Sequence, residues 1–180
     1  MESKQHNQPV SYLRFFAMIL TSMVVMYILM YVNSYQILDH AWFSETRLFM
    51  TLIMGGSMMA IMLSFMLGMY KNGRVNVGIY IGAALLLVLS IWLVRSQITV
   101  TDVDFMEGMI PHHSIAILTS ERSQIEDVRV RELADEIIEA QRREIKEMEW
   151  LIDDIRTNGV AANEEEASAR PVPEYSGTPE

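Results

Sequence analysis

Three long apolar stretches dominate the first half of the chain. Residues 13–32 are apolar apart from Arg14, Thr21 and Ser22, residues 48–70 carry no charge, and residues 75–94 have Asn76 as their one strongly polar residue. Each stretch has about 20 residues or more, the length that a helix needs to cross roughly 30 Å of hydrocarbon. The pattern predicts three transmembrane helices, at about residues 13–32, 48–70 and 75–94, in a membrane domain over residues 13–95.

The first stretch resembles the apolar part of a signal peptide. The residues that follow it, Tyr31-Val32-Asn33-Ser34-Tyr35, do not offer the small side chains of a cleavage site. We therefore expect it to be retained as a membrane span.

Basic residues near the spans predict the orientation, because they concentrate on the cytoplasmic side of membrane proteins. Lys4 and Arg14 lie at the start of the first span, and Lys71 and Arg74 lie in the turn between the second and third. We expect a multi-pass protein of the cell inner membrane, with residues 1–12 in the cytoplasm. The part after the third span then lies in the periplasm or an equivalent compartment.

The second half of the chain has helical periodicity. Thr101 and Asp104 form a capping-box pattern, and the residues that then recur at helical spacing are Phe105, Met109, His113, Ala116 and Ile117. Pro111 is expected to kink this helix just before the two His residues. A second helix is predicted over residues 128–156. Its apolar seam is interrupted by Gln141 and consists of Val130, Leu133, Ala134, Ile137, Ile138, Ile145, Met148, Leu151, Ile152 and Ile155.

A hairpin of two helices over residues 96–156 is too small to bury a core alone. We therefore predict an all-α protein in which a second copy completes a four-helix bundle, as a homodimer or higher homo-oligomer. Residues 157–180 are rich in Glu, Ala and Pro, and we expect them to form a disordered acidic tail.

The stretch Met106-Glu107-Gly108-Met109-Ile110-Pro111-His112-His113 combines two thioethers, a carboxylate and two imidazoles in a chain with four His. Soft sulfur beside imidazole nitrogen favours copper, especially Cu(I). Gln141, Glu144 and Met148 on the second helix are further candidate donors, whereas Glu107 is expected to be solvated. The chain has no Cys, which excludes disulfides and thiolate zinc or iron–sulfur sites.

These residues carry a resemblance to a known family. The spaced pattern runs from Asp102 through Phe105, Met109, His112 and His113 to Gln141, Glu144, Met148 and Leu151, and it resembles the domain of unknown function 305 family over residues 101–155. The resemblance implies a ferritin-like helical bundle and a link to copper binding and copper resistance in bacteria. Many members have the two-helix unit twice, whereas this chain has it once, which favours dimerisation.

Two other functions remain open. The second span carries Met50, Met54, Met58, Met62 and Met66, a stripe that a three-span copper transporter would use, although Met is also an ordinary membrane residue. Gly55 and Gly56, like the pair Gly78 and Gly82, predict close helix packing. A structural membrane protein without metal is the other alternative.

Charge and motifs narrow the remaining classes. Residues 1–100 hold 6 basic and 3 acidic residues, and the remainder holds 8 basic and 20 acidic residues. This acidic second half argues against nucleic acid as a partner and favours cations. The Glu-x-x-His motif of di-iron bundles does not occur, and we expect no enzymatic activity.

Overall fold

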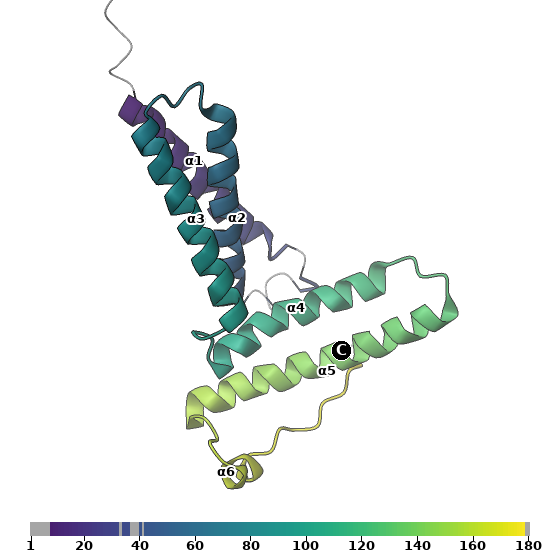
Figure 1. Ribbon diagram of the computed structural model, residues 1–180. Helices are drawn as coiled ribbons and strands as arrows, with labels where there is room; N and C mark the ends of the chain where they lie inside the picture. Colours follow the sequence, from purple (N-terminus) through teal and green to yellow (C-terminus); the bar gives the residue numbers. More distant parts are fainter. Residues whose placement is uncertain (1–7, 33, 37–39, 41, 179–180) are drawn as a thin grey trace, which may run out of the picture. The chain divides into compact units, whose positions relative to one another are not determined.

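The computed structural model describes residues 8–32, 34–36, 40 and 42–178 of the protein (Figure 1). Over these residues the regular secondary structure is entirely helical, as the sequence predicts. The helices are α1 (Gln8–Leu29), α2 (Glu45–Met66), α3 (Gly73–Ser96), α4 (Asp102–Arg122), α5 (Val128–Asn158) and α6 (Glu164–Ala169).

The chain divides into two compact units. One unit, the membrane unit, comprises Met1–Met30 and Thr46–Thr99, and the other, the hairpin unit, comprises Tyr31–Glu45 and Val100–Glu180. The connection between the first two spans therefore belongs to the same unit as the C-terminal half. We call the described residues of Tyr31–Glu45 the strap.

The membrane unit contains three helices that are long and apolar enough to cross a bilayer, over Ser11–Leu29, Glu45–Met66 and Gly73–Ser96. Each predicted span thus coincides with a long apolar helix, whose ends differ by a few residues from the predicted ones. A shared core buries Phe15 and Ile19 of α1 together with Leu63 of α2 and Ile79 of α3. Most of the remaining apolar surface is exposed within the unit, as expected where lipid is the solvent.

Small and polar residues explain two contacts inside the membrane unit. A Cβ atom on Gly55 would lie 2.4 Å from Sδ of Met23, so the glycine permits the close approach of α1 to α2. Gly78 and Gly82 have no such neighbour among the described residues, and their predicted packing role is not seen there. Asn76 is satisfied inside the unit, because it accepts a hydrogen bond from the Tyr12 hydroxyl at 2.7 Å and donates to the Tyr70 carbonyl at 2.8 Å.

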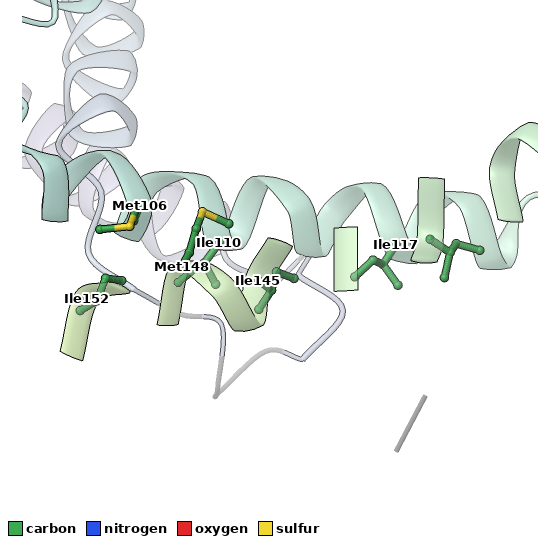
Figure 2. Close-up of a cluster of buried hydrophobic side chains, with 7 residues drawn as sticks. Met106, Ile110, Ile117, Ile145, Met148 and Ile152 are labelled. Carbon is green, nitrogen blue, oxygen red and sulfur yellow. The ribbon is translucent and has the colours of Figure 1, made fainter. Parts of the chain in front are cut away.

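In the hairpin unit, α4 and α5 lie side by side as an antiparallel pair (Figure 1). Thr101 and Asp104 form the predicted capping box at the start of α4, and the Asp127 side chain caps α5. Pro111, the predicted site of a kink, lies inside α4, and the helix continues through it. The core between the helices consists of Met106, Ile110, Ile117, Ile138, Ile145, Met148 and Ile152 (Figure 2).

The buried face of α4 differs from the predicted one. Phe105 is 56% exposed, and Met106 and Ile110 are buried in its place, while His113 and Ile117 are buried as predicted. On α5, Val130 and Leu133 are exposed although the central seam is buried as expected. The prediction for α4 failed because a second layer, the strap, also packs on this helix and changes which of its positions are covered.

The segment predicted to be a disordered tail contains regular structure. Helix α6 begins at the Asn163 cap, and Arg170 just after it pairs with Asp154 of α5 at 2.5 Å. Further on, Gly177 lies so close to the Glu139 carbonyl of α5 that a side chain there would clash with it. Composition favoured disorder, but contacts with α5 give the segment partners that its own sequence does not reveal.

Candidate metal site

His113 is the predicted ligand with the best-defined surroundings. It projects from α4, is 8% exposed, and places Nδ1 2.9 Å from the Met109 carbonyl oxygen one turn earlier. Its Nε2 lies 2.8 Å from Oε2 of Glu144 on α5. The contact joins the two helices and confirms that His113 and Glu144 face each other across the hairpin.

The partners of His113 constrain its protons. A carbonyl oxygen only accepts hydrogen bonds, so Nδ1 carries a proton and donates to Met109. An ionised Glu144 also only accepts, which requires a second proton on Nε2, or a proton on Glu144 itself. A metal cation bound to Nε2 and the carboxylate would satisfy the same atoms, since a ligating His usually donates its other N–H to a carbonyl.

His112 differs from its neighbour. Its side chain is exposed, and its ring centroid lies 6.0 Å from that of His113 with the planes at 68°. Adjacent residues on a helix are separated by about 100°, so the two imidazoles diverge. The sequence predicted both as ligands, but the structure brings only His113 to Glu144.

The predicted thioethers lie in the hairpin core, which also runs between α4 and α5. Met106 and Met148 belong to the buried cluster (Figure 2). Met109 packs against this cluster. Met109 also lies one turn before His113, on the same side of α4. Gln141, another predicted donor, is only partly buried, and it is Glu144 that contacts His113.

The donor set of the hairpin restricts the kinds of metal that it suits. Among the described residues, no group of three or more His, Asp and Glu side chains is placed to hold a metal ion. A metal at His113 and Glu144 would therefore need thioethers or donors from a second chain. Thioethers favour soft ions such as Cu(I) over Mg²⁺ or Ca²⁺.

Comparison with known proteins agrees with the two-helix architecture. Residues 94–177 match the sequence model of the family described as Domain of unknown function (DUF305). Residues 94–177 form a DUF305 domain. The chain is also 35% identical over 71 residues to an uncharacterized protein of Acanthamoeba polyphaga mimivirus.

That match covers 38% of this chain and 47% of the viral protein. The chain thus spans about half the length of the curated relative that it matches. No solved structure matches the chain significantly. The protein combines membrane-spanning helices with a DUF305 domain.

The packing of the strap against helix α4 of the DUF305 domain was not predicted from the sequence. Ser114, which follows His113, is fully buried, and its Oγ accepts a hydrogen bond from the Tyr35 amide at 2.6 Å. The same Oγ lies 2.8 Å from Nδ1 of the buried His40. The aromatic residues of this connection, among them Tyr35 and Trp42, were the signal that the segment packs on a protein surface.

Charged residues also join α4 to α5 on the DUF305 domain. Arg156 donates to Glu107 at 2.5 Å, and its guanidinium carbon lies 5.6 Å from the Trp42 ring centroid. Glu107 is 8% exposed, so the prediction that it is solvated is wrong. Arg156 makes its burial possible by supplying the opposite charge, since an unpaired buried carboxylate is costly.

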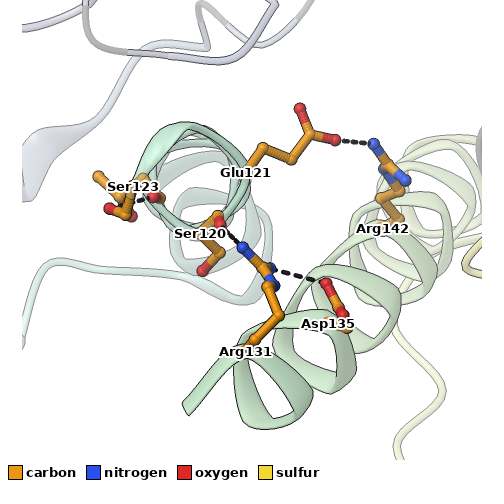
Figure 3. A network of polar contacts seen from close by, with 7 residues as sticks. Ser120, Glu121, Ser123, Arg131, Asp135 and Arg142 are labelled. Atoms are coloured by element: carbon orange, nitrogen blue, oxygen red, sulfur yellow. Dashed lines mark hydrogen bonds and ion pairs between the residues drawn. The ribbon is translucent and has the colours of Figure 1, made fainter. Parts of the chain in front are cut away.

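A second such arrangement lies nearer the turn of the hairpin. Arg142 pairs with Glu121 of α4 (Figure 3). Its guanidinium carbon lies 5.9 Å from the Tyr35 ring centroid. Arg131 there contacts Asp135 at 2.7 Å and donates to the Ser120 carbonyl at 2.9 Å. These polar contacts hold the end of the hairpin, where Val130 and Leu133 are exposed.

The Met stripe of α2 lies in the membrane unit and is not uniform. Met50 and Met54 are 45% and 37% exposed, whereas Met58, Met62 and Met66 pack against the membrane core. The five thioethers therefore do not form one buried line along the helix. This division argues against the stripe as a continuous path for an ion.

Proposed function

We propose that this protein is a membrane-anchored copper-binding protein, whose DUF305 domain holds the ion outside the cytoplasm for sequestration or handover. The proposal rests chiefly on the His113–Glu144 contact at 2.8 Å. We further propose that the spans lie in the inner membrane of the cell, with the N-terminus in the cytoplasm. The proposal assigns no enzymatic activity to the protein.

The surroundings of His113 support a ligand role. The Nδ1–H bond to the Met109 carbonyl fixes the ring and leaves Nε2 as the donor atom. The Glu144 side chain is 40% exposed, so the contact is not sealed off from solvent. His113 and Glu144 would hold the ion, with Met109 as the nearest thioether along α4.

Several other predicted donor residues have smaller roles in the proposed site. Met106 and Met148 supply soft sulfur in the adjoining core. His112 and Gln141 lie at the exposed margin, where they would contact an arriving ion or a second copy of the chain. Copper bound by such a set would be released more readily than from thiolates, which suits handover.

The test is a copper titration of the full chain in detergent, with the apparent affinity measured by competition against a chromophoric chelator. His113→Ala and Glu144→Gln are each expected to lower the affinity at least about tenfold. His112→Ala is the matched control, since it removes a neighbouring imidazole that does not contact Glu144. Its expected effect is less than about threefold, given its exposure.

Equal copper binding by wild type, His113→Ala and Glu144→Gln would reject the site. The contact would then be an ordinary ion pair, and the protein a structural membrane component. Proteolytic access to the DUF305 domain in right-side-out vesicles tests the orientation separately. Protection of the domain in intact vesicles, with cleavage after lysis, would reverse the proposed topology.

A further inference from the structure

We propose that Ser114 and the strap position His113, so that the segment joining the first two spans sets the geometry of the candidate metal site. This inference rests on the proposed function for its metal readout. Its structural readout, the state of the His113 ring, does not depend on copper.

Hydrogen bonds to Ser114 join the strap to α4. The Ser114 hydroxyl is completely buried, accepts from the Tyr35 amide and pairs with His40 Nδ1. A Ser hydroxyl has one donor and two acceptor positions, so two partners on the strap use most of its capacity. Losing the hydroxyl would leave the partly buried Tyr35 amide without this acceptor, which is unfavourable because a donor withdrawn from water needs a partner.

Two other contacts fix the strap along the hairpin. Tyr35 and Trp42 lie beside the guanidinium groups of Arg142 and Arg156, which are themselves paired with acidic residues of α4. Ser44 completes the contact, because a Cβ atom on Gly108 would lie 3.2 Å from its Oγ. The strap thus contacts both helices.

The position of Ser114 explains why its contacts matter for His113. Successive helical residues point about 100° apart, so fixing residue 114 toward the strap fixes residue 113 toward α5. A modest rotation of α4 would move Nε2 away from Glu144, since hydrogen bonds weaken steeply with misalignment. Ser114 touches no metal donor atom in this arrangement and acts through the helix as a positioning residue.

Nitrogen NMR of the full chain, labelled with ¹⁵N-His in detergent, tests the inference. Ser114→Ala is expected to shift both ring-nitrogen signals of His113 and to lower copper affinity about tenfold. Thr119→Ala is the control, since the Thr119 hydroxyl on the same helix bonds only to carbonyls of α4 in the contacts that it makes. That control is expected to change neither measurement.

His40 provides a second, milder pair of variants. His40→Ala removes one partner of Ser114, and His40→Asn retains a polar atom near the position of Nδ1. The His113 signals should shift in the first variant and return toward wild type in the second. If Ser114→Ala does not fold, the His40→Ala spectrum shows whether the strap positions the His113 ring.

Unchanged His113 signals in a folded Ser114→Ala or His40→Ala variant would overturn the positioning role. Equal loss of copper in His40→Ala and His40→Asn, with unchanged His113 signals, would make His40 a ligand and also overturn it. Failure of wild type to bind copper would reject only the proposed function, because the ring signals still report the position of His113.

Discussion

Methionines contribute to the packing of both units, but their neighbours differ. In the membrane unit, Met58, Met62 and Met66 pack against Phe15, Leu63 and other apolar residues. In the hairpin unit, Met106 and Met148 belong to a core whose helices are also joined by the His113–Glu144 contact. The difference indicates that thioether number alone does not define a soft-metal site, whereas a nearby imidazole and carboxylate do.

The two units also differ in what holds them together. Lipid is as apolar as Leu, so burial inside the membrane unit gains packing but little transfer energy. The hairpin unit is expected to be in water, where burial of its Ile residues contributes both packing and transfer free energy. Cross-helix ion pairs such as Glu107–Arg156 are also confined to the hairpin among the ion pairs described.

A matched pair of core truncations should show the largest effect. Ile152 and Leu63 are both completely buried, one in each unit. Ile152→Ala is expected to destabilise the hairpin by about 2–5 kcal/mol, because it loses the transfer energy and leaves a cavity. Leu63→Ala should cost the membrane unit less. Segment-resolved hydrogen exchange on the full chain in detergent measures both, and a larger effect at Leu63 would contradict this account of the two solvents.

Replacement of the methionines of each unit by Leu tests which set of thioethers contributes to copper binding. The triple variant Met106→Leu, Met109→Leu and Met148→Leu is expected to weaken Cu(I) binding about 10- to 100-fold. The corresponding replacement of Met58, Met62 and Met66 should leave the affinity within about threefold of wild type, as Leu-for-Met exchange largely preserves volume and packing. Competition titration of the full chain compares them. A greater loss in the membrane triple would favour transport through α2.

The sequence predicted the elements because their signals are local. Runs of about 20 apolar residues identify spans, and a capping box marks the start of α4. Glu144 was also among the donors that the sequence predicted, and the antiparallel pairing of α4 and α5 brings it to His113. Pro111 was expected to kink α4, and it lies inside a helix that continues to Arg122.

The remaining features depend on contacts that are distant in sequence. His40 and Ser114 are 74 residues apart, and Glu107 and Arg156 are 49 apart. Neither pair has a spacing rule that reveals it. Because the strap covers a second side of α4, periodicity alone assigned Phe105 to the core and left Met106 and Glu107 outside it.

Loss of one ion pair should have an intermediate effect. Glu107→Gln removes the charge that Arg156 pairs with in a buried position, and we expect a cost of about 1–2 kcal/mol to the hairpin. Asp135→Asn is the control, because its pair with Arg131 is an exposed contact within α5 worth about 0.5 kcal/mol or less. Urea unfolding of the full chain in detergent, followed by α5 hydrogen exchange, ranks the two. Equal costs would mean that burial of Glu107 adds nothing.

Acidification is expected to weaken the contacts that hold the segment after α5. This is the smallest of the expected effects. The hydrogen bond from Asn158, followed by the ion pair with Arg170, holds the pKa of the Asp154 carboxyl below its ordinary value of 3.8. Because this pKa is lowered in the folded state, the contact contributes fully above pH 3.8 and is lost as pH falls through the lowered value. Hydrogen exchange of residues 164–178, corrected for intrinsic rates, should rise over that interval in wild type. Asp154→Asn should show faster exchange at neutral pH and no comparable rise in acid. An identical acid response in the two proteins would assign the change to other carboxylates of the hairpin, such as Asp127, whose pKa is lowered by Arg129.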